Sequence, residues 1–159
     1  MRFEHLIEIN PLPTGSAEFV VPPFTEAQLW AGLLLKVREP QRFPLGPDRC
    51  TVTELEPELW RREQVFGANT LVDQVRLVPG RSLQFTPEPH GDTTPIRLTI
   101  SIESPRPGWL GLRYVYEALG EQSAEEAYFN EYRHSAWLAH DRDTVGTLRQ
   151  WLTDGQLPG

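Results

Sequence analysis

Arg62 and Asp73 are two residues of opposite charge that are expected on the core-facing side of a sheet. They lie on either side of Gly67-Ala68, in the segments WRREQVFG and VDQVRL. If Gly67-Ala68 forms a two-residue turn, Arg62 faces Asp73 on the same side of a hairpin, about 5 Å apart at Cβ. Apolar residues mark that side as the inner one: Leu71, Val75 and Leu77.

Two interpretations of this predicted pair stay open. An unpaired charge is strongly unfavourable inside a protein, and an Arg fork on a carboxylate satisfies both groups. The pair is therefore either a structural cross-strand ion pair or a ligand site, in which Arg62 orients a carbonyl or carboxylate and Asp73 holds the guanidinium. Both depend on the register, since a slip of one residue puts Arg62 and Asp73 on opposite faces.

The tyrosines form a second group of candidates. Tyr114 and Tyr116 share the inner face of one predicted strand, and Tyr128 and Tyr132 lie four residues apart on the predicted last helix. Such side chains serve as ordinary core, or their hydroxyls bind a ligand oxygen in a cavity. The ligand-binding residues expected from the sequence are Arg62, Asp73, Tyr114, Tyr116 and Tyr132.

The spacing of metal-ligating residue types argues against a metal site. His134 and His140 are six residues apart, so they do not share a helix face, and Asp141 and Asp143 diverge in the same way. The sequence also has no glycine-rich phosphate loop after a strand. We therefore expect neither a metal nor another cofactor.

A nucleophile–base arrangement is equally hard to assign. Cys50 has no histidine near it in the sequence, and we expect it to be a buried, inert thiol. His5 lies on the apolar face of the first predicted strand and is expected to be a hydrogen-bonded core histidine rather than a base. The catalytic residues, if the protein is an enzyme, stay unassigned at this point.

Composition limits the classes of partner and the compartment. The chain has 159 residues, 39% of them hydrophobic, and a net charge of −7, which disfavours nucleic acid and anionic membranes as partners. No apolar run reaches the roughly 18 residues of a membrane span, and the N-terminus lacks an apolar signal region. A single cysteine fits a reducing, cytoplasmic location. We expect one domain over residues 1–159.

Hydrophobic periodicity predicts the elements that must hold these side chains. A strand is expected over 2–9 and a helix over 25–39, with a Thr25–Gln28 capping box at its start and Pro40 at its end. A long helix is expected from Ser123 to about Leu152, with a kink or second start at Asp143 and Thr144. Between the helices, period-two alternation predicts strands near 50–56, 59–66, 69–78, 82–86, 96–103 and 108–118. The faces of strand 50–56 are not assigned.

The remaining segment, 10–23, is expected to be a surface loop. It contains four prolines, which cannot donate ladder hydrogen bonds, so we expect it to be more mobile than the sheet. The overall order of elements is strand, helix, six strands and long helix. This order predicts an α+β fold in which a helix packs on an antiparallel sheet.

Several segments together resemble the AtaL-like family of the SRPBCC superfamily, also called START-like or birch-pollen-allergen-like. The segments that carry the resemblance are RFEHLIEIN, TEAQLWAGLLLKVREPQRF, WRREQVFG, VDQVRL, AYFNEYRHSAW and HDRDTVGTLRQW. The resemblance spans nearly the whole chain. It implies a helix-grip fold, in which a seven-stranded curved antiparallel sheet surrounds the long C-terminal helix and encloses a deep cavity.

The resemblance also directs the hypotheses about function. Members of the superfamily bind lipids, hormones and polyketides, and a few are aromatase/cyclases. The first hypothesis is binding of a small apolar or aromatic molecule in the cavity. The second is a polyketide cyclase or dehydratase that uses Arg62, Asp73 and a tyrosine. The third is a structural interaction protein with a vestigial cavity, which exposed tryptophans would favour. Whether the chain forms a homodimer is left open.

Overall fold

Seven strands form one antiparallel sheet in the computed structural model, which describes residues 1–12 and 22–158. Their order across the sheet is β1-β7-β6-β5-β4-β3-β2, so the first strand lies beside the last and every other neighbour is a hairpin partner. Each pairing is antiparallel. The strands are β1 (Arg2–Asn10), β2 (Arg49–Glu56), β3 (Leu59–Phe66), β4 (Asn69–Val78), β5 (Ser82–Pro87), β6 (Ile96–Glu103) and β7 (Leu110–Ala118).

The β3–β4 hairpin has the register that the sequence predicts. Its turn is Gly67-Ala68, and Gly67 adopts a φ of 58°, the left-handed conformation that a two-residue hairpin turn requires. Phe66 pairs with Asn69, and Arg62 pairs with Asp73. The pairing of Val52 with Arg62 also assigns the faces of β2, because directly paired residues lie on the same side of the sheet.

The first helix, α1 (Glu26–Arg38), begins and ends within about one residue of the predicted range, 25–39. The Gln28 amide donates to the Thr25 hydroxyl, and the Thr25 amide donates to the Gln28 side chain, which completes the capping box. Pro40 begins the short 3-10 helix η1 (Pro40–Arg42) that follows. The apolar stripe of α1 is buried at Leu29, Leu33 and Val37.

The C-terminal helical region is divided, and the predicted place of the division is wrong. It consists of α2 (Ala124–Tyr128) and α3 (Asn130–Thr153), separated at Phe129. Asn130 exchanges side-chain hydrogen bonds with Gln122, which ties the start of α3 back to the segment before α2. Thr144, where a kink was expected, lies inside α3 and donates to the His140 carbonyl one turn earlier.

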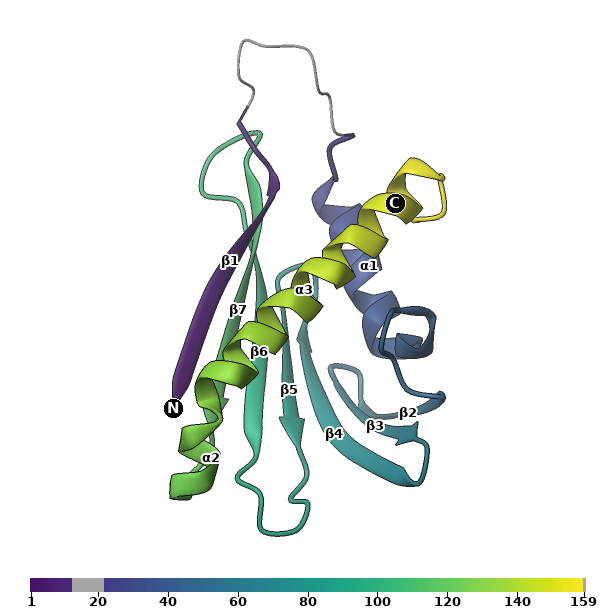
Figure 1. Ribbon diagram of the computed structural model, residues 1–159. Helices are drawn as coiled ribbons and strands as arrows, with labels where there is room; N and C mark the ends of the chain where they lie inside the picture. The colour runs from purple at the N-terminus through teal and green to yellow at the C-terminus, as the bar shows by residue number, and fades with distance from the viewer. Residues whose placement is uncertain (13–21, 159) are drawn as a thin grey trace.

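Both long helices pack on the concave face of the sheet. In Figure 1, α3 runs obliquely across that face from the β1–β7 side to the side where α1 lies. Val145 and Leu148 of α3 are buried there, whereas Trp137, Leu138 and Leu152 are half-buried. This arrangement is the helix-grip α+β fold that the sequence predicts.

Two further expectations concern the segment 10–23 and membrane-spanning helices. The segment 10–23, expected to be mobile, lies mostly outside the described residues. Among residues 1–12 and 22–158, none of the helices has the length and hydropathy of a membrane-spanning segment.

Candidate functional site

The predicted Arg62–Asp73 pair forms on the inner side of the sheet. Arg62 Nε donates to Asp73 Oδ1 over 2.8 Å, and Nη2 donates to Oδ2 over 2.6 Å. The side chains are only 7% and 13% exposed. Nη1 also donates to the Val37 carbonyl over 3.2 Å, and the guanidinium lies 5.0 Å from the centre of the Phe85 ring. The pair therefore ties the end of α1 to the sheet, and a ligand contact by either residue stays a prediction.

Tyr114 and Tyr116 of β7 point inward and are buried, as their alternation predicts. The Tyr116 hydroxyl donates to Asp141 Oδ2 over 2.7 Å. The Tyr114 ring stacks on the His5 imidazole, with 4.8 Å between ring centres. Burial raises the pKa of both tyrosines, and the Asp141 carboxylate raises it further, so both hydroxyls stay protonated.

Asp141 connects these residues to β1. Its Oδ2 lies 2.8 Å from Nε2 of His5, so one carboxylate oxygen contacts both an imidazole and a phenol. Asp141 is 4% exposed, and burial raises its pKa to about 6, although the hydrogen bonds from Tyr116 and His5 oppose that shift. His5 Nδ1 is buried and has no hydrogen-bond partner among residues 1–12 and 22–158.

The role of Asp141 is not predicted from the sequence, where this residue is a candidate only as a metal ligand. A signal is nevertheless present. Asp141 lies four residues after Trp137 and four before Val145, so it occupies the stripe of α3 that faces the sheet. A carboxylate on an apolar helix stripe needs hydrogen-bond partners, because it is buried away from water. Here His5 and Tyr116 are those partners.

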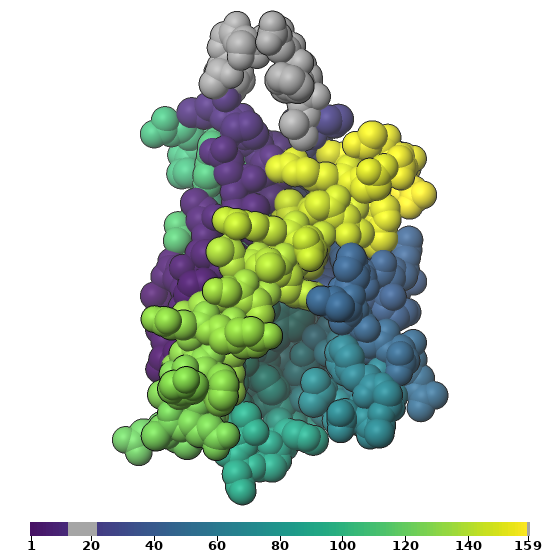
Figure 2. Space-filling model, in the orientation of Figure 1, coloured from purple at the N-terminus to yellow at the C-terminus, as the bar shows by residue number. Residues whose placement is uncertain are grey.

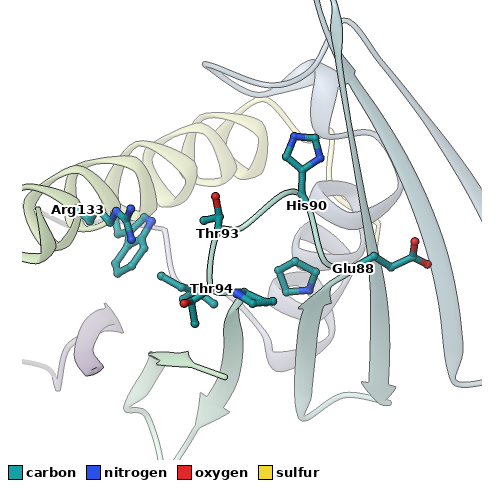
Figure 3. Close-up of a pocket in the computed structure, with 9 residues that line it drawn as sticks. Glu88, His90, Thr93, Thr94 and Arg133 are labelled. Atoms are coloured by element: carbon teal, nitrogen blue, oxygen red, sulfur yellow. The ribbon is translucent and has the colours of Figure 1, made fainter. Parts of the chain in front are cut away.

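Trp137 separates this buried group from the surface. Its indole stacks on the Tyr116 ring with 4.2 Å between ring centres. Trp137 also lines a pocket of about 360 Å³ between α3 and the segment that joins β5 to β6. We call it the Trp137 pocket (Figure 3); its lining residues are Pro87, Glu88, His90, Thr93, Thr94, Pro95, Ile96, Arg133 and Trp137.

A second hollow of about 210 Å³ lies on the other side of the segment 87–90. It shares Pro87, Glu88 and His90 with the Trp137 pocket, and Asp73 is the predicted site residue that borders it. Figure 2 shows the molecular surface hollowed between α3 and the strands behind it. Both hollows are open to solvent, and Phe85, Tyr114 and Tyr116 are buried in the core. The deep cavity that the family resemblance implies stays a prediction.

Tyr132 does not join the other predicted site residues. It is 75% exposed, and its neighbour Tyr128 is 81% exposed, so neither is buried against the sheet as expected. The reason is helical phase: at 3.6 residues per turn, Tyr132 points about 140° away from Trp137, which faces the sheet. Tyr132 therefore lies apart from Tyr116, and a ligand contact by Tyr132 stays a prediction.

Other titratable residues lie nearby on the inner side. Lys36 Nζ is 3.3 Å from His140 Nε2, and burial together with the Arg62 charge lowers the pKa of Lys36 to about 8. Cys50 is half-buried, and burial raises the pKa of its thiol, which keeps it protonated and unreactive. The described residues contain no group of three or more metal-ligating side chains.

Comparison with known proteins identifies the family. The model of the family described as acetylaranotin biosynthesis cluster protein L matches residues 13–155. The chain belongs to this AtaL family. A search of curated proteins by sequence finds no match.

Solved structures share the fold of this AtaL family member at low sequence identity. The aromatase/cyclase Zhui from a Streptomyces species has a TM-score of 0.62 and 12% identity, over 96% of this chain and 95% of its own. The protein Ara h 8.0201 has a TM-score of 0.58 and 9% identity, over 93% and 97%. The di-domain ARO/CYC protein StfQ of the steffimycin biosynthetic pathway has a TM-score of 0.64 and 14% identity, over 96% of this chain. The chain spans half of StfQ's length. These neighbours confirm the helix-grip α+β fold.

Proposed function

We propose that the protein binds a small apolar or aromatic molecule in the Trp137 pocket. The observation that carries this proposal is the composition of the pocket, in which the Trp137 indole, Ile96 and two prolines form apolar walls beside a few polar groups. A volume of about 360 Å³ falls within the range of pockets that hold small molecules. The fold of aromatase/cyclases and the family's link to a biosynthetic cluster support a ligand of this class.

The predicted ligand contacts fit this proposal to different degrees. Asp73 borders the second hollow, and Arg62 lies directly behind it. Tyr116 lies behind Trp137, and Tyr114 lies farther inside. We keep these four residues as proposed contacts for a ligand that enters past Trp137.

Native mass spectrometry of the purified protein, followed by extraction of any bound molecule, tests the proposal. Thr93 is exposed and lines the pocket, so Thr93→Trp should fill the pocket without disturbing the core. We expect this variant to lose the bound molecule. Thr51→Trp, at an exposed position of β2 outside the pocket, is the matched control and should retain it. A protein that carries no molecule and binds none of a panel of aromatic compounds would contradict the proposal.

A polyketide cyclase or dehydratase is the second candidate function, favoured by the group of His5, Tyr116 and Asp141. A carboxyl with a pKa of about 6 beside an imidazole and a phenol can exchange protons near neutral pH. If the protein has such an activity, Asp141→Asn should abolish turnover while ligand binding persists. Turnover that survives Asp141→Asn, Asp73→Asn and Tyr116→Phe would exclude these groups as the acid and base.

The third hypothesis, a structural interaction protein, receives less support. Trp60 is buried, and the other four tryptophans are half-buried rather than exposed. The exposed tryptophans that would favour this hypothesis are therefore not observed. A homodimer stays a prediction.

A further inference from the structure

Arg133 contributes a positive charge to the lining of the Trp137 pocket. It lies one helical turn before Trp137, so both side chains project from the same face of α3. Figure 3 shows Arg133 extending from the helix on the side of the pocket opposite His90 and Glu88. Arg133 is half-buried, and within residues 1–12 and 22–158 its guanidinium has no ion-pair or hydrogen-bond partner.

The acidic residues around the pocket do not form an ion pair with Arg133. Glu88 accepts from Arg61 Nε over 3.3 Å, and in Figure 3 its carboxylate points away from Arg133. Glu126 accepts from the Thr94 amide over 3.0 Å and from the Ser123 amide over 3.1 Å, so it completes a helix cap. Asp92 and Glu125 border an adjoining hollow with Arg133, but both are exposed, and water and salt screen their charges.

A guanidinium with free donors beside an indole ring is suited to one kind of ligand. Apolar walls lower the local dielectric and strengthen a charge-assisted hydrogen bond, and the planar guanidinium matches the two oxygens of a carboxylate. Resting on the ligand-binding function proposed above, we propose that the pocket selects aromatic molecules that carry a carboxylate or similar anionic oxygen group. Trp137 and Ile96 contact the ring, and Arg133 binds the anionic group.

A pair of probes of nearly equal shape tests the proposal. The acid is 2-naphthoate and its neutral counterpart is 2-naphthalenemethanol, both measured by isothermal titration calorimetry on the full chain. We expect the acid to bind at least about tenfold more tightly than the alcohol, since a hydrogen bond between charged groups contributes about that factor. Raising the salt concentration should weaken binding of the acid and leave the alcohol unchanged.

Two variants assign the preference to Arg133. Arg133→Gln should remove the difference between the acid and the alcohol. Arg142→Gln is the matched control, because Arg142 lies on the exposed face of the same helix, outside the pocket, and its removal changes the net charge equally. This control should keep the tenfold preference.

Arg61→Gln supplies a test that leaves Arg133 intact. Because the Glu88 carboxylate that Arg61 contacts is exposed and points away from Arg133, this change should keep the tenfold preference for the acid, whereas loss of the preference would show that charges at the pocket edge decide it. NMR chemical-shift changes of the Trp137 indole locate both probes in the pocket. The indole signal is assigned by its loss in the Trp137→Phe variant.

The outcomes separate this inference from the function on which it rests. If both probes bind at Trp137 with equal affinity and Arg133→Gln changes neither, the ligand-binding proposal stands and the role of Arg133 is overturned. If neither probe binds at the pocket, the ligand-binding proposal fails and this inference fails with it.

Discussion

Asp141 holds a carboxylate at a position where most surrounding side chains are apolar. Two hydrogen bonds to one of its oxygens, from Tyr116 and His5, offset part of the cost of burial. The pKa nevertheless rises from 3.8 to about 6, so burial outweighs the two partners. The charged form of Asp141 is therefore less favourable in the folded state than in the unfolded chain, and this difference can be measured.

We predict that Asp141 makes stability depend on pH in a direction unusual for a carboxylate. Because its folded pKa is raised, its contribution to stability is complete below about pH 3.8 and is lost as the pH rises through about 6. The free energy of unfolding of the wild type, relative to Asp141→Asn, should fall by about 2–3 kcal/mol between pH 4 and pH 7.5. Urea unfolding at a series of pH values measures it.

Asp143→Asn provides the control for this prediction, because Asp143 lies on the exposed face of the same helix. Its difference from the wild type should stay nearly constant over the same pH range. A difference for Asp141→Asn that grows with pH would mean that His5 holds the pKa of Asp141 below its ordinary value.

The Arg62–Asp73 pair leads to a second prediction at the residue scale. Removing one partner by Asp73→Ala or Arg62→Ala leaves a nearly buried charge, and each change should cost about 3–5 kcal/mol. The double variant Arg62→Met/Asp73→Leu removes both charges and should be far less destabilised than either single variant. Chemical denaturation of the three variants measures these losses of stability. Single-variant losses below about 1 kcal/mol would show that water reaches the pair freely.

At the scale of elements, the crossing of α1 and α3 depends on a glycine. A Cβ added at Gly32 would lie 2.8 Å from Leu148 Cδ2, and Leu148 is fully buried. The absence of a side chain at this position therefore lets the two helices approach each other closely. The same contact places α3 over the sheet, and with it Asp141 and Trp137.

We predict opposite effects of two Gly→Ala substitutions. Gly32→Ala should destabilise the protein by about 1–3 kcal/mol, because overpacking outweighs the gain in helix propensity. Gly146→Ala, on α3 with no atom within 4 Å of the added Cβ, should stabilise it by up to about 1 kcal/mol. Thermal and urea unfolding measure both. Stabilisation by Gly32→Ala would show that Leu148 moves aside without cost.

At the scale of the whole molecule, the C-terminal helices and the sheet need each other's apolar surfaces. The inner face of β7 carries Leu112, Tyr114 and Tyr116, and all three are buried. Each such side chain contributes about 1.5–3 kcal/mol when it is removed from water. Without α3, much of this surface would be exposed, and the sheet would lose a large part of its stabilisation.

A chain ending at Gln122 should therefore not fold cooperatively. We expect a broad, non-cooperative thermal transition and little near-ultraviolet circular dichroism, in contrast to the full chain. The experiment also tests the expectation that residues 1–159 form one domain. A soluble product that melts in a single sharp transition would show that the sheet is stable by itself.

The features that could be predicted from the sequence depend on residues close together in the chain. Period-two alternation located the strands, and the Gly67-Ala68 turn set the β3–β4 register. That register brought Arg62 opposite Asp73, because a two-residue turn leaves one way to pair the strands on either side of it. The capping box of α1 was predictable for the same reason, since Thr25 and Gln28 are separated by one turn.

Contacts between residues far apart in the chain could not be predicted in this way, because they depend on how the elements pack. His5 and Asp141 are 136 residues apart, and they touch because β1 pairs with β7 while α3 crosses above both. The interruption at Phe129 and the helical phase that follows it turned Tyr132 to solvent and Trp137 toward the sheet. Local patterns fix periodicity, but the phase of a helix against a sheet is set by the packing of both surfaces. Spacing in the sequence therefore indicates that Asp141 lies on the inner stripe of its helix, but it does not show that His5 and Tyr116 are its partners.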